Sequence, residues 1–139
     1  MAESTYQCDI VTPEKSVYAG QVHFVAVPGT GGEMGILDRH APTVSTLKPG
    51  AIRIKADEGA SEPTDLFVVS GGYVQIGSGR VTVLADRAAR VSDIDKEQVA
   101  ARIADLEQQL GGMAEDDPKR AFTDALLKWE EVKLNAVQG

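Results

Sequence analysis

The spacing of the apolar residues changes near Ser92, and this change constrains the fold more than any other feature of the sequence. Before Ser92, short runs rich in β-branched residues are separated by Gly, Pro and Asp, which is typical of strands joined by tight turns. After it, apolar residues recur at intervals of three and four, which is typical of amphipathic helices. The sequence therefore predicts a β domain over residues 1–88 and an α domain over residues 89–139.

Within the first domain, apolar residues alternate with polar ones. Ile52 and Ile54 occupy one face of a run in which Arg53 and Lys55 occupy the other, and residues 6–11 alternate in the same way. Such alternation places one face of each strand against a core. Because no helical period separates these runs, the pattern predicts an antiparallel β-sandwich or barrel.

Two helical stripes follow in the second domain. Asp95 and Gln98 fit a capping box at the start of the first helix, and the glycines at 111 and 112 fit its end. A second helix is expected to begin at Asp117-Pro118, which gives an antiparallel helical hairpin. Two helices alone cannot cover their apolar faces, so the hairpin must also rest on the β domain or on a partner. The expected stripes are Val99, Ile103, Leu106 and Leu110 in the first helix, and Phe122, Ala125, Trp129, Val132 and Ala136 in the second.

Composition and charge narrow the classes of function. The 42% apolar and 25% charged residues are ordinary for a globular protein. A net charge of −7 argues against nucleic acid as a partner, because phosphate binding needs a basic surface. With Cys8 as the single cysteine, an intrachain disulfide is impossible, and its alternation with Tyr6 and Ile10 predicts a buried thiol. No apolar stretch approaches the length of a membrane span, so direct membrane insertion is not expected.

The glycine-rich segment from residue 28 to residue 35 invites a nucleotide-binding interpretation, which its residues do not support. It lacks the Lys-Ser/Thr ending of a phosphate loop, and Glu33 would repel a phosphate. A turn that exposes Glu33 and Met34 at its tip is the better prediction. The two histidines, His23 and His40, have no further metal ligands at suitable spacing. The sequence thus indicates no metal site, no cofactor and no catalytic constellation.

An ordered set of motifs resembles the epsilon subunit of bacterial F-type ATP synthases. The resemblance extends over nearly the whole chain and is weakest in the helical hairpin. It implies a sandwich of about ten strands followed by two helices, which agrees with the pattern above. The motifs are Gly32-Glu33-Met34-Gly35-Ile36-Leu37, His40-Ala41-Pro42, Leu47-Lys48-Pro49-Gly50, Ser70-Gly71-Gly72, Val81-Thr82-Val83-Leu84-Ala85-Asp86, Arg90 and Asp93-Ile94-Asp95.

The resemblance also implies a function and partners. In that family the sandwich binds the gamma subunit and rests on the membrane-embedded c-ring, so that ion-driven rotation reaches the catalytic head. The chain is then expected to be a non-catalytic rotor subunit, held peripherally at the cytoplasmic face of the bacterial plasma membrane. The resemblance assigns Glu33, Met34 and Gly35 to the c-ring contact, and Thr12, His40, Ala41 and Ser45 to the gamma contact.

For the hairpin, the resemblance implies regulation. In some relatives it extends toward the alpha and beta subunits and inhibits ATP hydrolysis through basic residues, here Lys119, Arg120, Lys128 and Lys133. Residues 91–139 carry eleven acidic and six basic side chains, so we expect weak inhibition.

Some relatives bind ATP through an Asp-x-x-Arg motif beside the hairpin. This chain keeps Asp95 but has Gln98 in place of the arginine, and Leu127 and Glu131 stand where two further arginines align. Tight ATP binding is therefore not expected. The alternative that stays open is a small nucleotide- or ligand-binding β-sandwich module, or a jelly-roll enzyme, with an accessory helix pair.

Overall fold

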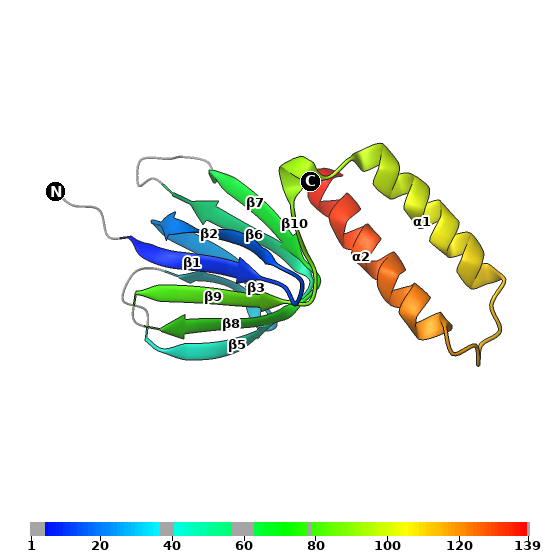
Figure 1. Cartoon of the computed structure of the whole chain (residues 1–139), viewed down its shortest axis with the longest axis horizontal. Helices are drawn as coiled ribbons and strands as arrows, with labels where there is room; N and C mark the ends of the chain where they lie inside the picture. Colours follow the sequence, from blue (N-terminus) through cyan, green and yellow to red (C-terminus); the bar gives the residue numbers. More distant parts are fainter. Residues whose placement is uncertain (1–4, 37–40, 57–62, 78, 139) are drawn as a thin grey trace. The chain divides into compact units, whose positions relative to one another are not determined.

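A computed structural model describes residues 5–36, 41–56, 63–77 and 79–138. The chain forms two compact units, Met1–Ser92 and Asp93–Gly139 (Figure 1). This boundary lies four residues after the expected one at 88/89. The reason is strand β10 (Ala88–Arg90), which pairs with β7 (Asp65–Val69) and so belongs to the β unit. A short 3₁₀ turn, Val91–Asp93, follows it.

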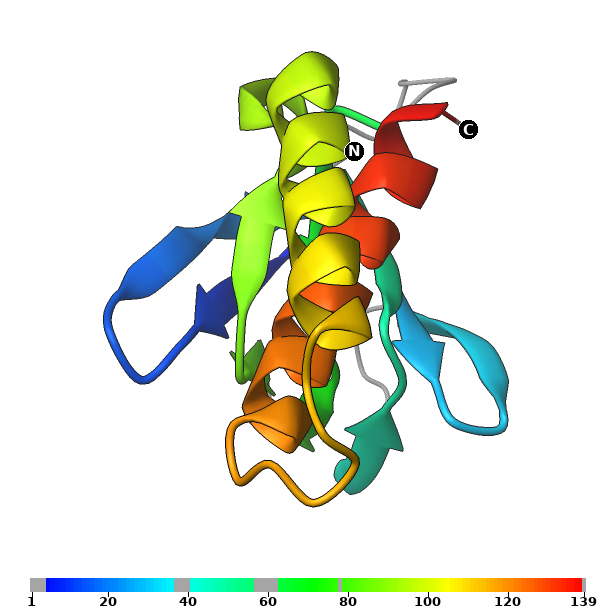
Figure 2. The ribbon, with the colours of Figure 1, turned by 90° about the vertical axis from the view of Figure 1, so that its right-hand side faces the viewer.

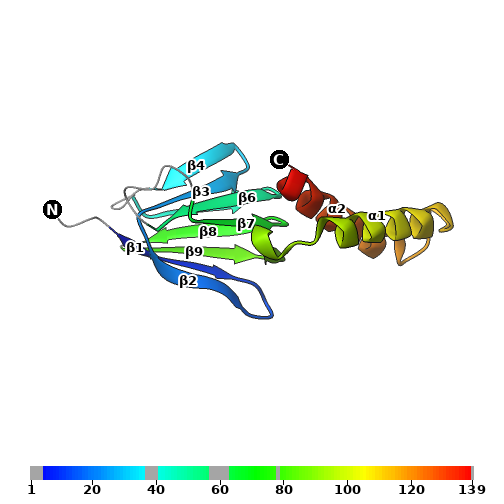
Figure 3. The same cartoon turned by 90° about the horizontal axis from the view of Figure 1, so that it is seen from above.

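The described residues of the first unit form ten strands, and all are joined by hydrogen bonds in the order β10-β7-β6-β3-β5-β8-β9-β1-β2, with β4 paired to β3. The expected sandwich of about ten strands is confirmed. β3 and β5 share a single residue pair, Gly29 with Leu47, and this narrow link lets the sheet fold into two layers (Figure 3). The remaining strands are β1 (Tyr6–Val11), β2 (Ser16–Val22), β3 (Phe24–Gly29), β4 (Gly32–Ile36), β5 (Thr43–Leu47), β6 (Gly50–Lys55), β8 (Gly72–Gly77) and β9 (Arg80–Ala85).

One pairing departs from the antiparallel pattern. β1 runs parallel to β9, with Cys8 beside Val81 and Ile10 beside Val83, and antiparallel to β2 on its other side. Alternation within a strand shows which residues face the core, but it does not identify the neighbouring strand. The sequence therefore predicted the strand and left its partner unknown.

The core of the sandwich lies between its two layers and contains no charged side chain among the described residues. Inward positions of successive strands supply it, as the alternation predicted for Ile52 and Ile54, both 0% exposed. Cys8 is also 0% exposed, and burial, with a smaller contribution from Asp9, raises the pKa of its thiol to about 12. The buried thiol is confirmed. The core residues are Tyr6, Cys8, Ile10, Val22, Val25, Val27, Ile36, Leu47, Ile52, Ile54, Phe67, Val69, Val74, Ile76, Val81, Val83 and Ala85.

Phe67 is the largest side chain that is completely buried in this core. The Tyr18 ring meets it edge-on at a centroid distance of 5.4 Å, and the Arg90 guanidinium carbon lies 4.7 Å from the ring centroid. Arg90 also forms an ion pair with Asp65. Strand β10 is thus attached to the sheet by side chains as well as by its backbone hydrogen bonds.

Two antiparallel helices, α1 (Lys96–Gly111) and α2 (Arg120–Gln138), form the second unit and lie side by side (Figure 2). Asp95 is the N-cap of α1, with its Oδ1 accepting from the Glu97 and Gln98 backbone N–H groups at 3.0 and 3.2 Å. Gly112 is the C-cap. Both predicted ends of the first helix are confirmed. None of the helices in the described residues is long and apolar enough to cross a membrane.

The second helix differs from its prediction at its start and in its buried face. It begins at Arg120, because Asp117 and the two residues after it form a turn in which Asp117 Oδ1 accepts from the Lys119 N–H at 2.8 Å. Its most buried residues are Thr123 and Glu130, whereas Phe122, in the predicted stripe, is 63% exposed. The predicted stripe is therefore wrong for the face toward α1. By contrast, the expected stripe of the first helix holds its least exposed apolar residues.

Candidate functional site

The outer surface of strands β5, β8 and β9 is the most distinctive surface of the sandwich. We call it the β5–β8–β9 face. Three of its large apolar side chains are exposed: Val44 by 69%, Tyr73 by 55% and Leu84 by 45%. Tyr73 lies directly opposite Leu84, and Val44 is diagonal to Tyr73 because it pairs with Gln75. The face consists of Val44, Thr46, Tyr73, Gln75, Thr82 and Leu84.

Val44, Tyr73 and Leu84 matter because exposed apolar side chains grouped on one face mark an interaction surface more reliably than scattered ones. Five large apolar side chains are exposed within the described residues, and three of the five lie here. Their neighbours Thr46, Gln75 and Thr82 are uncharged, although the whole chain carries a net charge of −7. An aromatic, aliphatic and uncharged patch is the composition expected for the centre of a protein interface.

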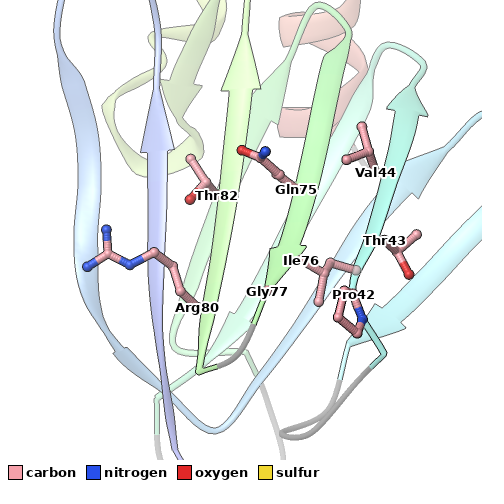
Figure 4. Close-up of a pocket in the computed structure, with 8 residues that line it drawn as sticks. All are labelled: Pro42, Thr43, Val44, Gln75, Ile76, Gly77, Arg80 and Thr82. Carbon is pink, nitrogen blue, oxygen red and sulfur yellow. The ribbon is translucent and has the colours of Figure 1, made fainter.

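A shallow hollow of about 450 Å³ continues this face toward the strand ends that carry Thr43, Gly77 and Arg80 (Figure 4). Figure 4 shows the side chains of Gln75 and Thr82 next to each other, whereas Arg80, nearer the strand end, turns its guanidinium away from Gln75. The hollow offers hydroxyl, amide and guanidinium groups along an apolar wall. Its residues are Pro42, Thr43, Val44, Gln75, Ile76, Gly77, Arg80 and Thr82.

Beyond β9 the same layer becomes polar. Gln21 donates to Gln7 at 3.1 Å, Gln7 donates to Asp9 at 2.9 Å, and Arg80 Nη1 lies 3.5 Å from the Asp9 carboxylate. This row of side chains connects β2, β1 and β9. Because Arg80 is balanced by Asp9, it adds little net charge at the rim of the hollow. The face is thus bordered on one side by a polar rim, as in many protein interfaces.

The glycine-rich segment forms the β3–β4 hairpin, and its turn lies elsewhere than predicted. Gly29 pairs with Gly32, so the two residues of the turn are Thr30 and Gly31. Glu33 lies on strand β4, on the outer surface of the other layer, where its side chain is 54% exposed. Arg53 Nη2 donates to its Oε1 at 2.5 Å. The prediction that Glu33 and Met34 form the turn tip is wrong.

Met34 and Gly35 differ from Glu33 in their surroundings. Met34 is half-buried and packs against the core of the sandwich. Gly35 is exposed, but a Cβ at this position would lie 2.9 Å from the ring of Phe24. Glycine therefore permits Phe24 to cover this part of β4. The three residues assigned to a c-ring contact are adjacent in sequence, and only Glu33 offers an exposed charged side chain.

The residues assigned to a gamma contact are spread along one layer. Ala41 is exposed and precedes β5, Ser45 is half-buried within β5, and Thr12 is half-buried in the turn after β1. The register from β5 through β8 and β9 to β1 places Ala41 and Thr12 at opposite ends of the strands. The structure does not bring these residues into one cluster. His40 lies outside the described residues.

The cations assigned to inhibitory contacts differ in their availability. Arg120 donates to the carbonyl oxygens of Leu110 and Met113, both at 3.2 Å, and so closes the end of α1. Lys133 is 12% exposed and binds Glu130 at 2.8 Å. Lys128 is exposed but lies 3.1 Å from Asp124. Lys119 is exposed. The hairpin therefore uses two of its four candidate cations for its own structure.

Asp95, the single residue retained from the nucleotide-binding motif, has a structural role. Its carboxylate caps α1 through two backbone N–H groups. Such capping alone accounts for an aspartate at the start of a helix. This carboxylate gives no support to nucleotide binding.

Comparison with known proteins identifies relatives of both units. A family model described as the ATP synthase, Delta/Epsilon chain, beta-sandwich domain matches residues 5–91. The ATP synthase epsilon chain of Acinetobacter baylyi is 40% identical over 113 residues, which cover 81% of this chain and 79% of that protein. The epsilon chain of Bordetella petrii is 38% identical over 124 residues, 89% of this chain and 85% of that protein.

Solved structures show the same fold. A chain in the Euglena gracilis mitochondrial ATP synthase, solved as OSCP/F1/c-ring, superimposes with a TM-score of 0.73 at 23% identity and covers 97% of this chain and 82% of its own. A chain in the Tetrahymena thermophila mitochondrial ATP synthase central stalk and c-ring superimposes with a TM-score of 0.60 at 13% identity, covering 99% of each. The sandwich and the two helices thus recur together in these structures.

Proposed function

The chain belongs to the ATP synthase delta/epsilon chain family, and on this premise we propose that it is a non-catalytic subunit of the central stalk of an F-type ATP synthase. In this role it connects a gamma-type shaft to a c-ring, so that ion-driven rotation reaches the catalytic head. It makes and breaks no covalent bond. It is held at the cytoplasmic face of the membrane by its partners.

The observation that supports this function best is the β5–β8–β9 face. A part that transmits rotation needs a stiff body and a complementary surface. A sandwich with an apolar core between two hydrogen-bonded layers supplies the stiffness. Exposed Val44, Tyr73 and Leu84 supply an uncharged surface that loses unfavourable contact with water when a partner covers it. We assign this face to the gamma-type subunit, with Ala41 just before strand β5 and Ser45 on the opposite side of that strand.

The other layer fits the c-ring. Glu33 is exposed on β4 and paired with Arg53, so this surface offers one charge of each sign to polar loops. Met34 supports the hairpin from below, and Gly35 lets Phe24 lie over β4. We therefore assign Glu33, together with Arg53, to the c-ring contact. In this assignment Met34 and Gly35 shape the contact.

The hairpin is proposed to modulate ATP hydrolysis weakly. Lys119 and Lys128 are the cations most available to the alpha and beta subunits, and the eleven acidic residues of the hairpin oppose an acidic partner surface. Deleting residues 93–139 should leave assembly and ion coupling largely intact and change hydrolysis by less than about threefold. A large rise in hydrolysis by the assembled complex would contradict this weak role.

A matched pair of substitutions tests the main proposal. Leu84→Glu places a charge in the β5–β8–β9 face, whereas Leu66→Glu places the same charge on β7 of the other layer at similar exposure, 39% against 45%. We expect Leu84→Glu to weaken binding to the gamma-type subunit by about tenfold or more, because an unpaired charge would be buried. Leu66→Glu should bind within about twofold of the wild type.

The measurement is the dissociation constant of the full chain for the purified gamma-type subunit, with circular dichroism to verify folding. If the Leu84→Glu variant bound the gamma-type subunit as tightly as the wild type, the β5–β8–β9 face would not be the binding surface. Failure of the wild-type chain to bind the gamma-type subunit at all would overturn the stalk function itself.

A further inference from the structure

Glu130 is the unusual residue of the helical hairpin. It lies on α2, its side chain is only 8% exposed, and it is a carboxylate among partly buried leucines. Burying a charge is costly unless partners compensate for the lost water. The residues that surround Glu130 therefore determine whether its burial stabilises or destabilises the hairpin.

Each carboxylate oxygen of Glu130 has a different environment. Oε2 lies 2.8 Å from Lys133 Nζ, one turn further along the same helix, and Lys133 in turn lies over the ring of Trp129 at 5.5 Å. Oε1 is buried and forms no hydrogen bond within the described structure. The cation that α1 contributes to it is Arg102, whose Nη1 lies 3.8 Å from Oε1 and whose side chain is 54% exposed.

This division makes one oxygen sensitive to how the helices are aligned. The contact with Lys133 moves with α2, so it forms in any alignment of the two helices. The contact with Arg102 crosses from one helix to the other, so it forms only when Glu130 lies beside the turn of α1 that carries Arg102. If α2 slipped by one turn, the Glu130 carboxylate would keep Lys133 but lose Arg102, and Oε1 would be buried without a cation from α1.

The remaining contacts between the helices are less selective for one alignment of α1 against α2. α1 presents Ile103, Leu106 and Leu110, and the buried side of α2 presents leucines at 126, 127 and 134. Aliphatic side chains of similar size pack acceptably in more than one alignment, which is why coiled coils often use a buried polar residue to fix their register. Arg120 closes the hairpin at its turn, but eight residues, 112–119, separate the helices there.

We propose that Arg102, Glu130 and Lys133 form a polar pin that fixes the register of α1 against α2 and lowers the stability of the hairpin in return. Because all three charged groups meet in one register only, the pin favours that alignment of the two helices over the others. It also makes helix pairing depend on a single charge from α1. Arg102 acts here as a positioning residue.

Two variants of the full chain separate the effects on stability and on alignment. Arg102→Leu removes the cation that α1 contributes to Glu130 and leaves Lys133 alone to balance it, and we expect amide hydrogen exchange in α1 and α2 to become roughly tenfold faster or more, with the sandwich amides unchanged. The double variant Arg102→Leu, Glu130→Leu removes the buried charge, and its helices should exchange as slowly as in the wild type or more slowly.

Alignment is read from Trp129, the single tryptophan of the chain. In the wild type its indole N–H should give one sharp NMR resonance, and in the double variant several or broadened resonances, because aliphatic contacts alone permit more than one register. Glu131→Leu is the matched control: it introduces the same side chain at the neighbouring exposed position and should preserve one resonance and the wild-type exchange rates.

Either of two results would overturn the proposal. The first is hydrogen exchange in the Arg102→Leu variant that matches the wild type, which would mean that Arg102 does not support Glu130. The second is a single unshifted Trp129 resonance in the double variant, which would mean that aliphatic packing fixes the register without the charges.

Discussion

The sandwich and the hairpin bury different chemistry. Seventeen of the described residues form the sandwich core, and none of these is charged. The most buried residues of the hairpin are Val99, Thr123 and Glu130, of which two are polar. Apolar burial is the dominant favourable contribution to folding, whereas a buried ion pair contributes little net stability and much specificity. We therefore expect the sandwich to be more stable than the hairpin, whose pairing depends partly on charges. Substitutions and pH changes in the two units test this contrast.

The largest effect is expected from Phe67→Ala. Phe67 is completely buried and contacts both Tyr18 and Arg90, so its removal should lower the free energy of unfolding of the sandwich by about 3–5 kcal/mol. The free energy of unfolding is measured by urea denaturation, monitored through the circular dichroism of the β-sheet. Phe122→Ala removes the same side chain from a site on α2 that is 63% exposed and should cost less than about 1 kcal/mol. Similar costs at the two sites would break the contrast.

A smaller effect should follow from alkaline pH. Burial raises the pKa of the Cys8 thiol from 9.0 to about 12, so the folded chain keeps its proton where the unfolded chain loses it. The unfolded state then binds fewer protons, and the free energy of unfolding should fall as pH rises from about 9 to 12. Below pH 9 this contribution is complete and constant. Cys8→Ala should show a shallower decline over the same range, and an identical slope would mean that Cys8 does not contribute.

Removing the cap of α1 should cost about 1 kcal/mol of helix stability. Asp95→Ala leaves the Glu97 and Gln98 N–H groups without an acceptor from this side chain. Hydrogen exchange of the α1 amides should become roughly fivefold faster, and exchange in the sandwich should stay the same. Asp93→Ala, two residues earlier and exposed, serves as the control. Equal acceleration by both variants would point to general charge effects.

The smallest effect is expected for the pair of Lys128 and Asp124. Both side chains are exposed, by 73% and 46%, and lie four residues apart on α2. Exposed pairs of this kind contribute about 0.3–0.5 kcal/mol and weaken with salt. Lys128→Ala should therefore change hairpin exchange by less than about threefold at low salt, and by less still at 1 M salt. A larger effect that persists in salt would reveal a more specific role for Lys128.

Local alternation was sufficient to predict most of the fold. It identified the inward residues Ile52 and Ile54 and the buried thiol of Cys8, while the helical spacing of three and four identified the apolar stripe of α1. Each of these depends on periodicity within one element, which a sequence records directly. The parallel partner of β1 was not predictable, because the pairing joins residues more than seventy positions apart.

The errors share a cause. The apolar residues of α2 predict one stripe, but the helix has a second face that contains Glu130, whose burial is compensated by Lys133 on the same helix and Arg102 on α1. A segment with four glycines permits a turn at several positions, and its sequence alone does not distinguish a tip at Glu33 and Met34 from the observed turn at Thr30 and Gly31.

For a related reason, the sequence alone does not reveal the β5–β8–β9 face. Leu84 belongs to a run that is apolar almost throughout, and its exposure becomes evident only when Val81, Val83 and Ala85 are seen to face inward. The sequence signal for this face is therefore an apolar residue, such as Leu84, at a position of the strand that alternates with the inward-facing residues. The same criterion marks Tyr73, whose neighbours Val74 and Ile76 define the inward phase of β8.

The parallel contact between β1 and β9 has a consequence for the order of events during translation. The N-terminal strand leaves the ribosome first, yet one of its two neighbours is completed only when Ala85 has emerged. At about 5–20 residues per second, the nascent strand waits several seconds with one edge unpaired. We therefore expect the sandwich to close late, near the end of its own synthesis, whereas the local contacts of the helices can form as soon as they emerge.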